Sequence, residues 1–438
     1  MDIIHPYAAG IDVGSRSHFV SIGQKSEDVQ EFGVYTEDYE KMITWLRSHQ
    51  ITTVAMESTG TYWQTLFMAL QSAGFEVLLV NGGDIKNVKG RKTDVLDCMW
   101  IQQLHSLGLL QGNFLPDEAT RQLRSFYTHR QSFIAQRSKY SLKMQQSLRL
   151  MNIRLDVVLR DITGKSGKNI IEAILAGERK AEHLASLVDV RVKKSQKEII
   201  ASLQGDWKED LLFILRDCWE MYQYYGDKIE QVDKQMETVL KNNLVSKPLA
   251  QAIATHSRKR SHKNKPSFDV RSLAHHFFGV DFYQIGGIND GTVLCLLSTL
   301  GDGIAHFPSA KHFVSWLRLA PNNKISGGKI LSSRTPKGKN RLALVLRQAA
   351  NSIGNMKTHP LKKFFDRIAY KKGRGAAITA TARKLAIIIY NMLTKKEEFN
   401  QEYDKQQVEK NRQKNLTALR KKVVELKLNE DEKKLIFE

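Results

Sequence analysis

Two short apolar runs separated by a helix-length segment most constrain the fold of the first 110 residues. TTVAMES (52–58) and FEVLLVN (75–81) are typical of buried strands, and TYWQTLFMALQSAG (61–74) between them has the apolar spacing of a helix. AAGIDVG (8–14) and HFVSIG (18–23) predict a hairpin, with QEFGVYT (30–36) as a third strand. The order βββαβαβ predicts a mixed sheet covered by helices, an α/β fold.

Four carboxylates occupy special places in this pattern. Asp12 lies where the first strand turns, and Glu57 ends a buried strand. Asp94 and Asp97 fall on one face of a helix that begins at KTDVLD, with Thr93 as its N-cap. Carboxylates at the ends of buried strands are costly unless a cation meets them. Oxygen ligands from separate elements are suited to Mg²⁺ and to phosphoryl transfer.

Each carboxylate also has a structural interpretation. Asp12 could cap the hairpin, Glu57 could pair with Lys92, and Asp94 and Asp97 could serve only their own helix. The order D…E…D-x-x-D on this scaffold is more specific, because it is similar to that of RNase H-like nucleases of the RuvC type. IDVG also resembles the phosphate turn of actin-like ATPases, but INDGT (288–292) is a poorly placed second turn.

The remaining chain is expected to be largely helical. Polar stretches with widely spaced apolar residues predict long helices or a coiled coil within 113–245, interrupted around GKSGKNII (164–171). Aromatic residues there are expected to pack in a core rather than to stack on RNA. Residues 246–270 form a basic linker, 271–400 a compact helical domain and 401–438 a charged tail. Residues 1–112 are the predicted catalytic domain.

Charge indicates the class of partner. Lys and Arg number 67 against 46 Asp and Glu, a formal charge of +21, which favours a polyanion. Between 334 and 374 twelve basic residues accompany one acid, Asp366, as expected of a phosphate-binding surface. Three cysteines without a CxxC pair, no secretory signal and no bilayer-length apolar run predict a cytoplasmic protein, associated with the nucleoid when active.

Ser326 stands in a glycine turn, NKISGGK (323–329). Alone it has an ordinary turn interpretation, as do its neighbours Ser332 and Ser333. Upstream, YQIGGINDGTVLCLLSTLGD (283–302) resembles a helix-hairpin-helix element, or a plain α-hairpin. The nucleic-acid-binding residues proposed from this region and from the first domain are Lys92, Gly327, Gly328, Lys329, Arg334, Lys337, Lys339, Arg341 and Arg347.

These motifs together resemble the DEDD-type transposases of insertion-sequence family 110, which are related to the Piv DNA invertases. GIDVGSRSH, AMESTGTYW and KTDVLD resemble the family's N-terminal motifs, and SGGK and PKGKNRLALVLRQAA its C-terminal domain. The chain departs from the family at IGGI, where Gly286 replaces a usual proline. The resemblance implies a RuvC-like domain in which Asp12, Glu57, Asp94 and Asp97 bind Mg²⁺. It also implies that Ser326 forms a covalent phosphoserine intermediate with DNA.

The same resemblance implies partners: donor and target double-stranded DNA, a structured guide RNA (bridge RNA) from the element, and homodimers that assemble into tetramers. Two other functions remain open from the sequence. A RuvC-like structure-selective nuclease would use water as its nucleophile. A basic architectural protein with a vestigial site would need no carboxylates.

Overall fold

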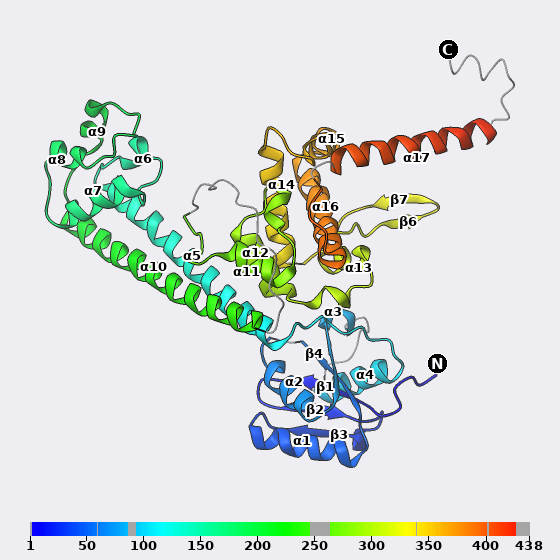
Figure 1. Ribbon diagram of the computed structural model, residues 1–438. Helices are drawn as coiled ribbons and strands as arrows, with labels where there is room; N and C mark the ends of the chain where they lie inside the picture. The colour runs from blue at the N-terminus through cyan, green and yellow to red at the C-terminus, as the bar shows by residue number, and fades with distance from the viewer. Residues whose placement is uncertain are drawn as a thin grey trace. The chain divides into compact units, whose positions relative to one another are not determined.

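A computed structural model describes residues 2–58, 60–85, 93–245, 263–338, 340–400 and 403–425. The chain divides into two compact units, Met1–Leu115 and Pro116–Glu438 (Figure 1). Two of the proposed binding residues, Lys92 and Lys339, lie outside the described residues, as do most of the basic linker and the last part of the tail. The finer division of the second unit, and the boundary at 112, stay predictions.

The first unit is built on a five-stranded sheet with the order β3-β2-β1-β4-β5. The first three strands pair antiparallel, and β4 and β5 continue the sheet in parallel with β1. This mixed order is RNase H-like, which confirms the predicted fold class. The strands are β1 (Ala8–Val13), β2 (His18–Ser21), β3 (Val29–Phe32), β4 (Thr53–Glu57) and β5 (Glu76–Val80).

Alternation along the strands gives the sheet two apolar faces. Ala9, Ile11 and Val13 of β1 pack with the buried residues of α1 (Thr36–Ser48) and α2 (Trp63–Ser72). On the opposite face Ala55 and Val80 pack with Ile85 of α3 (Gly82–Ile85) and Ile101 of α4 (Asp94–Ser106). A short 3₁₀ turn, η1 (Ser26–Asp28), joins β2 to β3. The even-numbered positions of β1, which include Asp12, therefore face α4.

The second unit begins with a long helical hairpin. Helices α5 (Glu118–Leu150) and α10 (Glu209–Leu244) lie side by side along most of their length (Figure 1). Aromatic side chains of the two helices mostly pack in a core, as expected from the sequence: Tyr127, Trp219 and Tyr222 are buried, whereas Tyr224 is half exposed. The far end carries four short helices with their own apolar core: α6 (Leu155–Val158), α7 (Lys165–Leu175), α8 (Ala181–Ser186) and α9 (Gln196–Ser202).

A buried ion pair crosses the hairpin near its base. The Arg130 guanidinium donates to both carboxylate oxygens of Asp233, at 2.5 and 3.2 Å, and both side chains are almost fully buried. Asp233 also accepts from the backbone N–H of Ser267, and Arg130 donates to the carbonyl of Asn264. The chain that enters the C-terminal helices is thus tied to both long helices.

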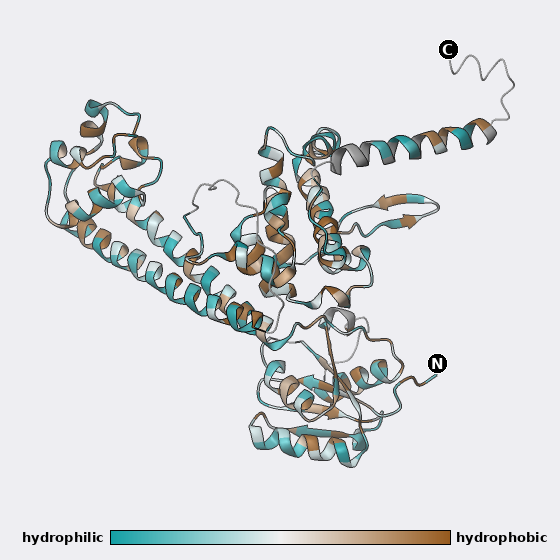
Figure 2. Cartoon of the chain, in the orientation of Figure 1, coloured by the Kyte–Doolittle hydropathy of each residue, from teal (hydrophilic) through white to brown (hydrophobic). Residues whose placement is uncertain are grey.

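The rest of the unit is a helical bundle that carries a separate two-stranded sheet. Figure 2 shows hydrophobic residues gathered on the bundle helices and mostly hydrophilic residues along α5 and α10. The elements are α11 (Val270–Phe278), η2 (Phe282–Ile285), α12 (Asp290–Leu300), η3 (Gly303–His306), α13 (Ala310–Trp316), β6 (Lys324–Ser326), β7 (Lys329–Ser332), α14 (Arg341–Asn355), α15 (Lys362–Lys372), α16 (Arg374–Lys395) and α17 (Tyr403–Glu425).

Helix α16 is long and apolar enough to cross a membrane by length and composition. Half of its most apolar stretch is nevertheless buried, against α13, α14 and α15. A core helix of a bundle passes the same test of length and composition.

Candidate active site

Strands β1 and β4 bring two carboxylates to the same edge of the sheet. In the parallel pairing Ile11 lies opposite Met56, and the next residue of each strand is Asp12 or Glu57. Side chains one position further along both strands point to the same face, the face covered by α4. The predicted convergence of Asp12 and Glu57 follows from this register.

Helix α4 begins at the same edge and lies directly on β1. A Cβ at Gly10 would overlap the backbone of α4 at Cys98 and Gln102, so the absence of a side chain there allows the close approach. Thr93 caps the helix as predicted, accepting from the Leu96 N–H at 3.4 Å. The cap fixes the first turn, which carries Asp94 and Asp97.

Gly82 has a matching role beside Glu57. A Cβ at Gly82, the first residue of α3, would overlap the Glu57 carboxylate. The carboxylate therefore lies against the backbone at the start of α3. Sequence reasoning did not single out Gly10 or Gly82; the only signal was a glycine in the middle of a strand and another directly after one.

The charges of the four carboxylates act on one another. The pKa of Asp12 is raised from 3.8 to about 6, first by burial and then by Asp94, Asp97 and Glu57. The pKa of the buried Cys98 thiol is raised to about 12, by burial and then by Asp12. Asp12, Glu57, Asp94 and Asp97, called the acidic cluster below, concentrate negative charge where the sheet edge meets α4.

The acidic cluster fits a divalent metal ion in the kind of ligand it offers, because all four side chains supply hard oxygen donors. A bound cation would also relieve the repulsion between the four carboxylates. Within the described ranges, however, no group of three or more His, Cys, Asp or Glu side chains is gathered closely enough to hold an ion. The cluster is thus coupled electrostatically without being assembled at coordination distance.

Ser326 belongs to an exposed ribbon of two strands, β6 and β7, rather than to an irregular turn. Ser326 pairs with Lys329 and Ile325 with Ile330 across the ribbon. Gly327 and Gly328 between the strands have φ of +53° and +75°, the left-handed values that a type I′ turn requires at both positions. No atom lies within 4 Å of a Cβ built at either glycine, so backbone conformation selects them and not crowding.

The ribbon is exposed except at Ser332, its last residue, which is half-buried, and it projects from the bundle in Figure 1. Within the described residues, neither the Ser326 hydroxyl nor the Lys329 ammonium has a hydrogen-bond or ion-pair partner. Ile325 and Ile330 are about three-fifths exposed, at 62% and 61%. Ser326 is therefore carried on an exposed ribbon that makes few packing contacts with the rest of its unit.

Two regions of the chain match known family models. Residues 9–153, which include the acidic cluster, match a model described as a transposase. Residues 282–366, which include Ser326, match one described as a transposase of the IS116/IS110/IS902 family. Together the two matches cover just over half of the chain.

The chain belongs to the IS110 family of transposases.

A curated relative gives a narrower match. Over 109 residues the chain is 33% identical to the insertion element IS110 uncharacterized 43.6 kDa protein of Streptomyces coelicolor. The match covers 24% of this chain and spans about a quarter, 26%, of that relative. Membership of the IS110 family therefore stands on the two family models, and what the whole protein does is a matter of proposal.

Other cations proposed from the sequence have different surroundings in this IS110-family chain. Arg334 and Lys337 are exposed close to the ribbon. The Arg341 guanidinium donates to the Thr128 hydroxyl of α5, and Arg347 is half-buried. Arg318 was not proposed, yet it donates to the Lys337 carbonyl at the base of the ribbon. Its positive φ of +55° is unusual outside glycine and has no signal in the sequence.

The glycine turn of the predicted helix-hairpin-helix element is packed against the bundle. Gly286 and Gly287 have φ of +73° and +74°, between η2 and α12. A Cβ at Gly287 would press on Ile353 and on the Ala349 carbonyl of α14, and His359 lies beside Gly286. His359 Nε2 is also within hydrogen-bonding distance, 2.5 Å, of the Ile285 carbonyl.

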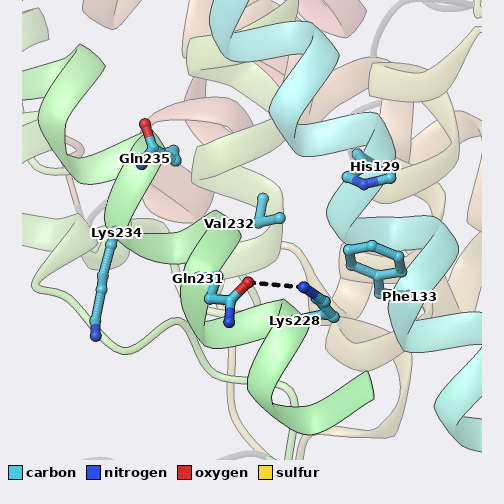
Figure 3. A pocket seen from close by; sticks show the side chains of 7 residues that line it. All are labelled: His129, Phe133, Lys228, Gln231, Val232, Lys234 and Gln235. Carbon is cyan, nitrogen blue, oxygen red and sulfur yellow. Dashed lines mark hydrogen bonds between the residues drawn. The ribbon is translucent and has the colours of Figure 1, made fainter. Parts of the chain in front are cut away.

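A shallow hollow of about 540 Å³ opens between α5 and α10. Figure 3 shows His129 and Phe133 on α5 facing Lys228 and Val232 on α10, with Lys228 donating to Gln231 at 3.1 Å. Lys234 points away from the other side chains drawn there. The lining contains no acidic side chain. Its residues do not form a recognisable catalytic or ligand-binding constellation.

Proposed function

We propose that this chain is a Mg²⁺-dependent DNA recombinase that excises and integrates an insertion sequence through a phosphoserine intermediate on Ser326. The observation that carries the proposal is the acidic cluster. Burial and three like charges raise the pKa of Asp12 to about 6, an arrangement that costs stability in the unliganded protein. Perturbed carboxylates at one edge of an RNase H-like sheet are typical of a site for phosphoryl transfer.

Ser326 supplies the nucleophile in this proposal. Its Oγ bonds to the scissile phosphorus while the bond from phosphorus to a DNA sugar oxygen breaks. The serine hydroxyl loses its proton, and the departing sugar oxygen takes one up. A free DNA hydroxyl then reverses the step on a new strand. Each phosphodiester is exchanged for another, so no ATP is needed.

The ribbon offers positive charge where the reaction needs it. Negative charge grows on the phosphoryl oxygens in the transition state, and donors already in place there lower the barrier. Lys329 pairs with Ser326 across the ribbon, and Arg334 follows in the same exposed segment. Asp12, Glu57, Asp94 and Asp97 would hold Mg²⁺, which when bound neutralises phosphate charge and helps ionise an attacking hydroxyl.

Double-stranded DNA of the donor and the target is the proposed substrate. The resemblance to the family also brings a structured guide RNA and dimers that assemble into tetramers into the proposal, with action in the cytoplasm. The charge of +21 and the run of twelve cations against one acid support polyanionic partners of either kind.

Covalent trapping tests the proposal directly. The wild-type chain, incubated with Mg²⁺ and a nicked suicide DNA substrate, should give a protein–DNA adduct that survives denaturation. Ser326→Ala should give none, whereas Ser332→Ala, at the end of the ribbon, and Ser333→Ala, just beyond it, should still give it. An adduct with the Ser326 variant would overturn the nucleophile assignment.

The same reaction separates the competing functions. Cleaved DNA without any adduct would identify a nuclease that uses water. DNA binding without cleavage, unchanged when the acidic cluster is neutralised, would identify an architectural protein. Sequencing the RNA that co-purifies with the protein tests the guide: one structured species from the flank of the element is expected.

A further inference from the structure

Helix α15 presents a face that the proposed chemistry does not use. Lys363, Arg367 and Tyr370 recur at helical spacing and are all exposed. Phe365, on the other side of the helix, is buried in the bundle. Lys371 extends the exposed side toward the end of the helix. These four exposed residues, Lys363, Arg367, Tyr370 and Lys371, are called the α15 face.

Tyr370 is the most exposed aromatic residue in the described part of the chain. Its side chain is 93% exposed, against 77% for Tyr35 and 50% for Tyr224. A ring left in water forgoes the burial that usually holds an aromatic side chain. Burial against this unit therefore does not account for a tyrosine at this position, whereas a partner that covers the ring would.

The charge around Tyr370 is positive. The one acid on α15, Asp366, is bound by the Lys362 ammonium at 2.6 Å, so the helix itself supplies no other acid to balance Arg367 and Lys371 on the α15 face. Arg374, just beyond the helix, is held by Asn351 and Asn355 and so contributes its charge from a fixed position. The ring lies within a field that attracts anions.

We infer that the α15 face binds a nucleic-acid strand, with its phosphates on the cations and an unpaired base stacked on the ring of Tyr370. Phosphate charge and a flat aromatic surface occur together in nucleic acids, and single-strand binding proteins combine cations with aromatic platforms in this way. A base within a duplex is already stacked on both sides, so the ring selects unpaired nucleotides. The inference rests on the proposed action on nucleic acids and adds a site to it.

Binding in EDTA tests the site without any strand cleavage. The full-length protein is titrated into labelled oligouridine, oligothymidine and a DNA duplex, each of about 12 nucleotides or base pairs. Tyr370→Ala should weaken binding of the single strands by about 5- to 100-fold, the usual effect of losing one stacked base. Duplex binding should change by less than about twofold, because phosphate contacts remain.

Two variants control the measurement. Tyr370→Phe keeps the ring and should bind single strands like the wild type. Tyr35→Ala removes another exposed tyrosine, which precedes a helix with Glu37 and Asp38 in its first turn, and should have no effect. Loss of only oligouridine binding would assign the base to RNA and loss of only oligothymidine binding to DNA, and either supports the site.

Three results would overturn the inference. Tyr370→Ala could match Tyr35→Ala; it could weaken duplex and single strands equally; or it could change the molar mass of the protein in solution, which would make the α15 face a contact between copies. Adduct formation by Ser326 is a separate measurement. The Ser326 assignment can fail while base stacking on Tyr370 is confirmed. A wild-type chain that binds no nucleic acid would contradict both proposals.

Discussion

Ser326 and Lys329 are cross-strand partners at the end of the β6–β7 ribbon, with only two glycines between them. Side chains of such a pair lie on the same face of a hairpin. Lys329→Ala should therefore slow adduct formation by about 10- to 1000-fold, with DNA affinity changed far less, because its charge acts mainly on the transition state. Lys329→Arg should recover part of the rate. Lys197→Ala, which removes an exposed charge on α9, should leave the rate unchanged.

Gly327 should tolerate asparagine better than valine. Its φ of +53° is a left-handed conformation that asparagine adopts readily and a β-branched residue does not. Gly327→Asn is expected to retain adduct formation, whereas Gly327→Val should lose most of it while the thermal unfolding of the protein barely changes. Equal adduct yields from the two variants would show that the type I′ turn does not position Ser326.

Asp12→Asn should stabilise the metal-free protein while it abolishes cleavage. The pKa of Asp12 in the folded protein is about 6, above the ordinary 3.8, so the carboxyl resists ionisation and stability is lost as pH rises from about 4 to 6. Above that range the pKa difference corresponds to about 3 kcal/mol, which solvent screening of the partly exposed carboxyl lowers to an expected gain of about 2 kcal/mol for the variant. Thermal unfolding in EDTA measures the difference, with Glu31→Gln as a control on β3.

With Mg²⁺ present, the wild type should become more stable than Asp12→Asn. If the acidic cluster binds the ion, Mg²⁺ raises the Tm of the wild type and has little effect on Asp12→Asn. A wild-type Tm that does not respond to Mg²⁺ at neutral pH would contradict the proposed metal site.

His105 should make the first unit sensitive to acid. The side chain is buried, His105 Nε2 lies 2.9 Å from the Thr53 hydroxyl, and the ring stacks on His5. Burial, and then His5, lower the pKa of His105 from 6.5 to about 4. Because the folded-state pKa is depressed, the stability is complete above about pH 6.5 and falls as pH drops toward 4.

A variant that cannot titrate isolates this effect. Relative to His105→Gln, the wild type should lose about 3 kcal/mol between pH 6.5 and 4. Unfolding curves at a series of pH values test this, and parallel pH profiles for the two proteins would refute it.

Asp233→Ala should be strongly destabilising because it leaves the Arg130 guanidinium buried without its partner, at a cost of about 3–5 kcal/mol. The double variant Arg130→Met/Asp233→Leu should recover much of that loss. Hydrogen exchange at the Ser267 N–H reports whether the chain before α11 has come away from Asp233. Single and double variants of equal stability would argue that the pair carries no buried charge.

The sequence predicted elements whose signals are local. The strand and helix order of the first unit, the Thr93 cap and the two long helices follow from periodicity and capping, and the structure confirms them. Asp12 and Glu57 could be placed together because parallel strands end at a common edge. How far the four carboxylates stand apart could not be predicted, because it depends on how closely α4 packs on β1.

Two local interpretations were incomplete or wrong. The alternation in KISGGKILS around a Gly-Gly pair is a hairpin signal, yet only a glycine turn was inferred from it. GKSGKNII was expected to interrupt helical structure, but α7 begins there. Within α7, position 167 is a glycine because a Cβ there would overlap the Ile162 carbonyl. The glycine serves a close contact between segments, which is not visible in a single sequence.

The packing at Gly10 and Gly82 bears on which copies of a mobile element still encode an active protein. A copy that keeps all four acids and the serine would pass as intact when judged by its reactive groups. A side chain at Gly10 would lift α4 from the sheet, and one at Gly82 would displace the Glu57 carboxylate. A substitution at Gly10 or Gly82, neither of which carries a reactive group, can thus identify a copy that encodes an inactive protein.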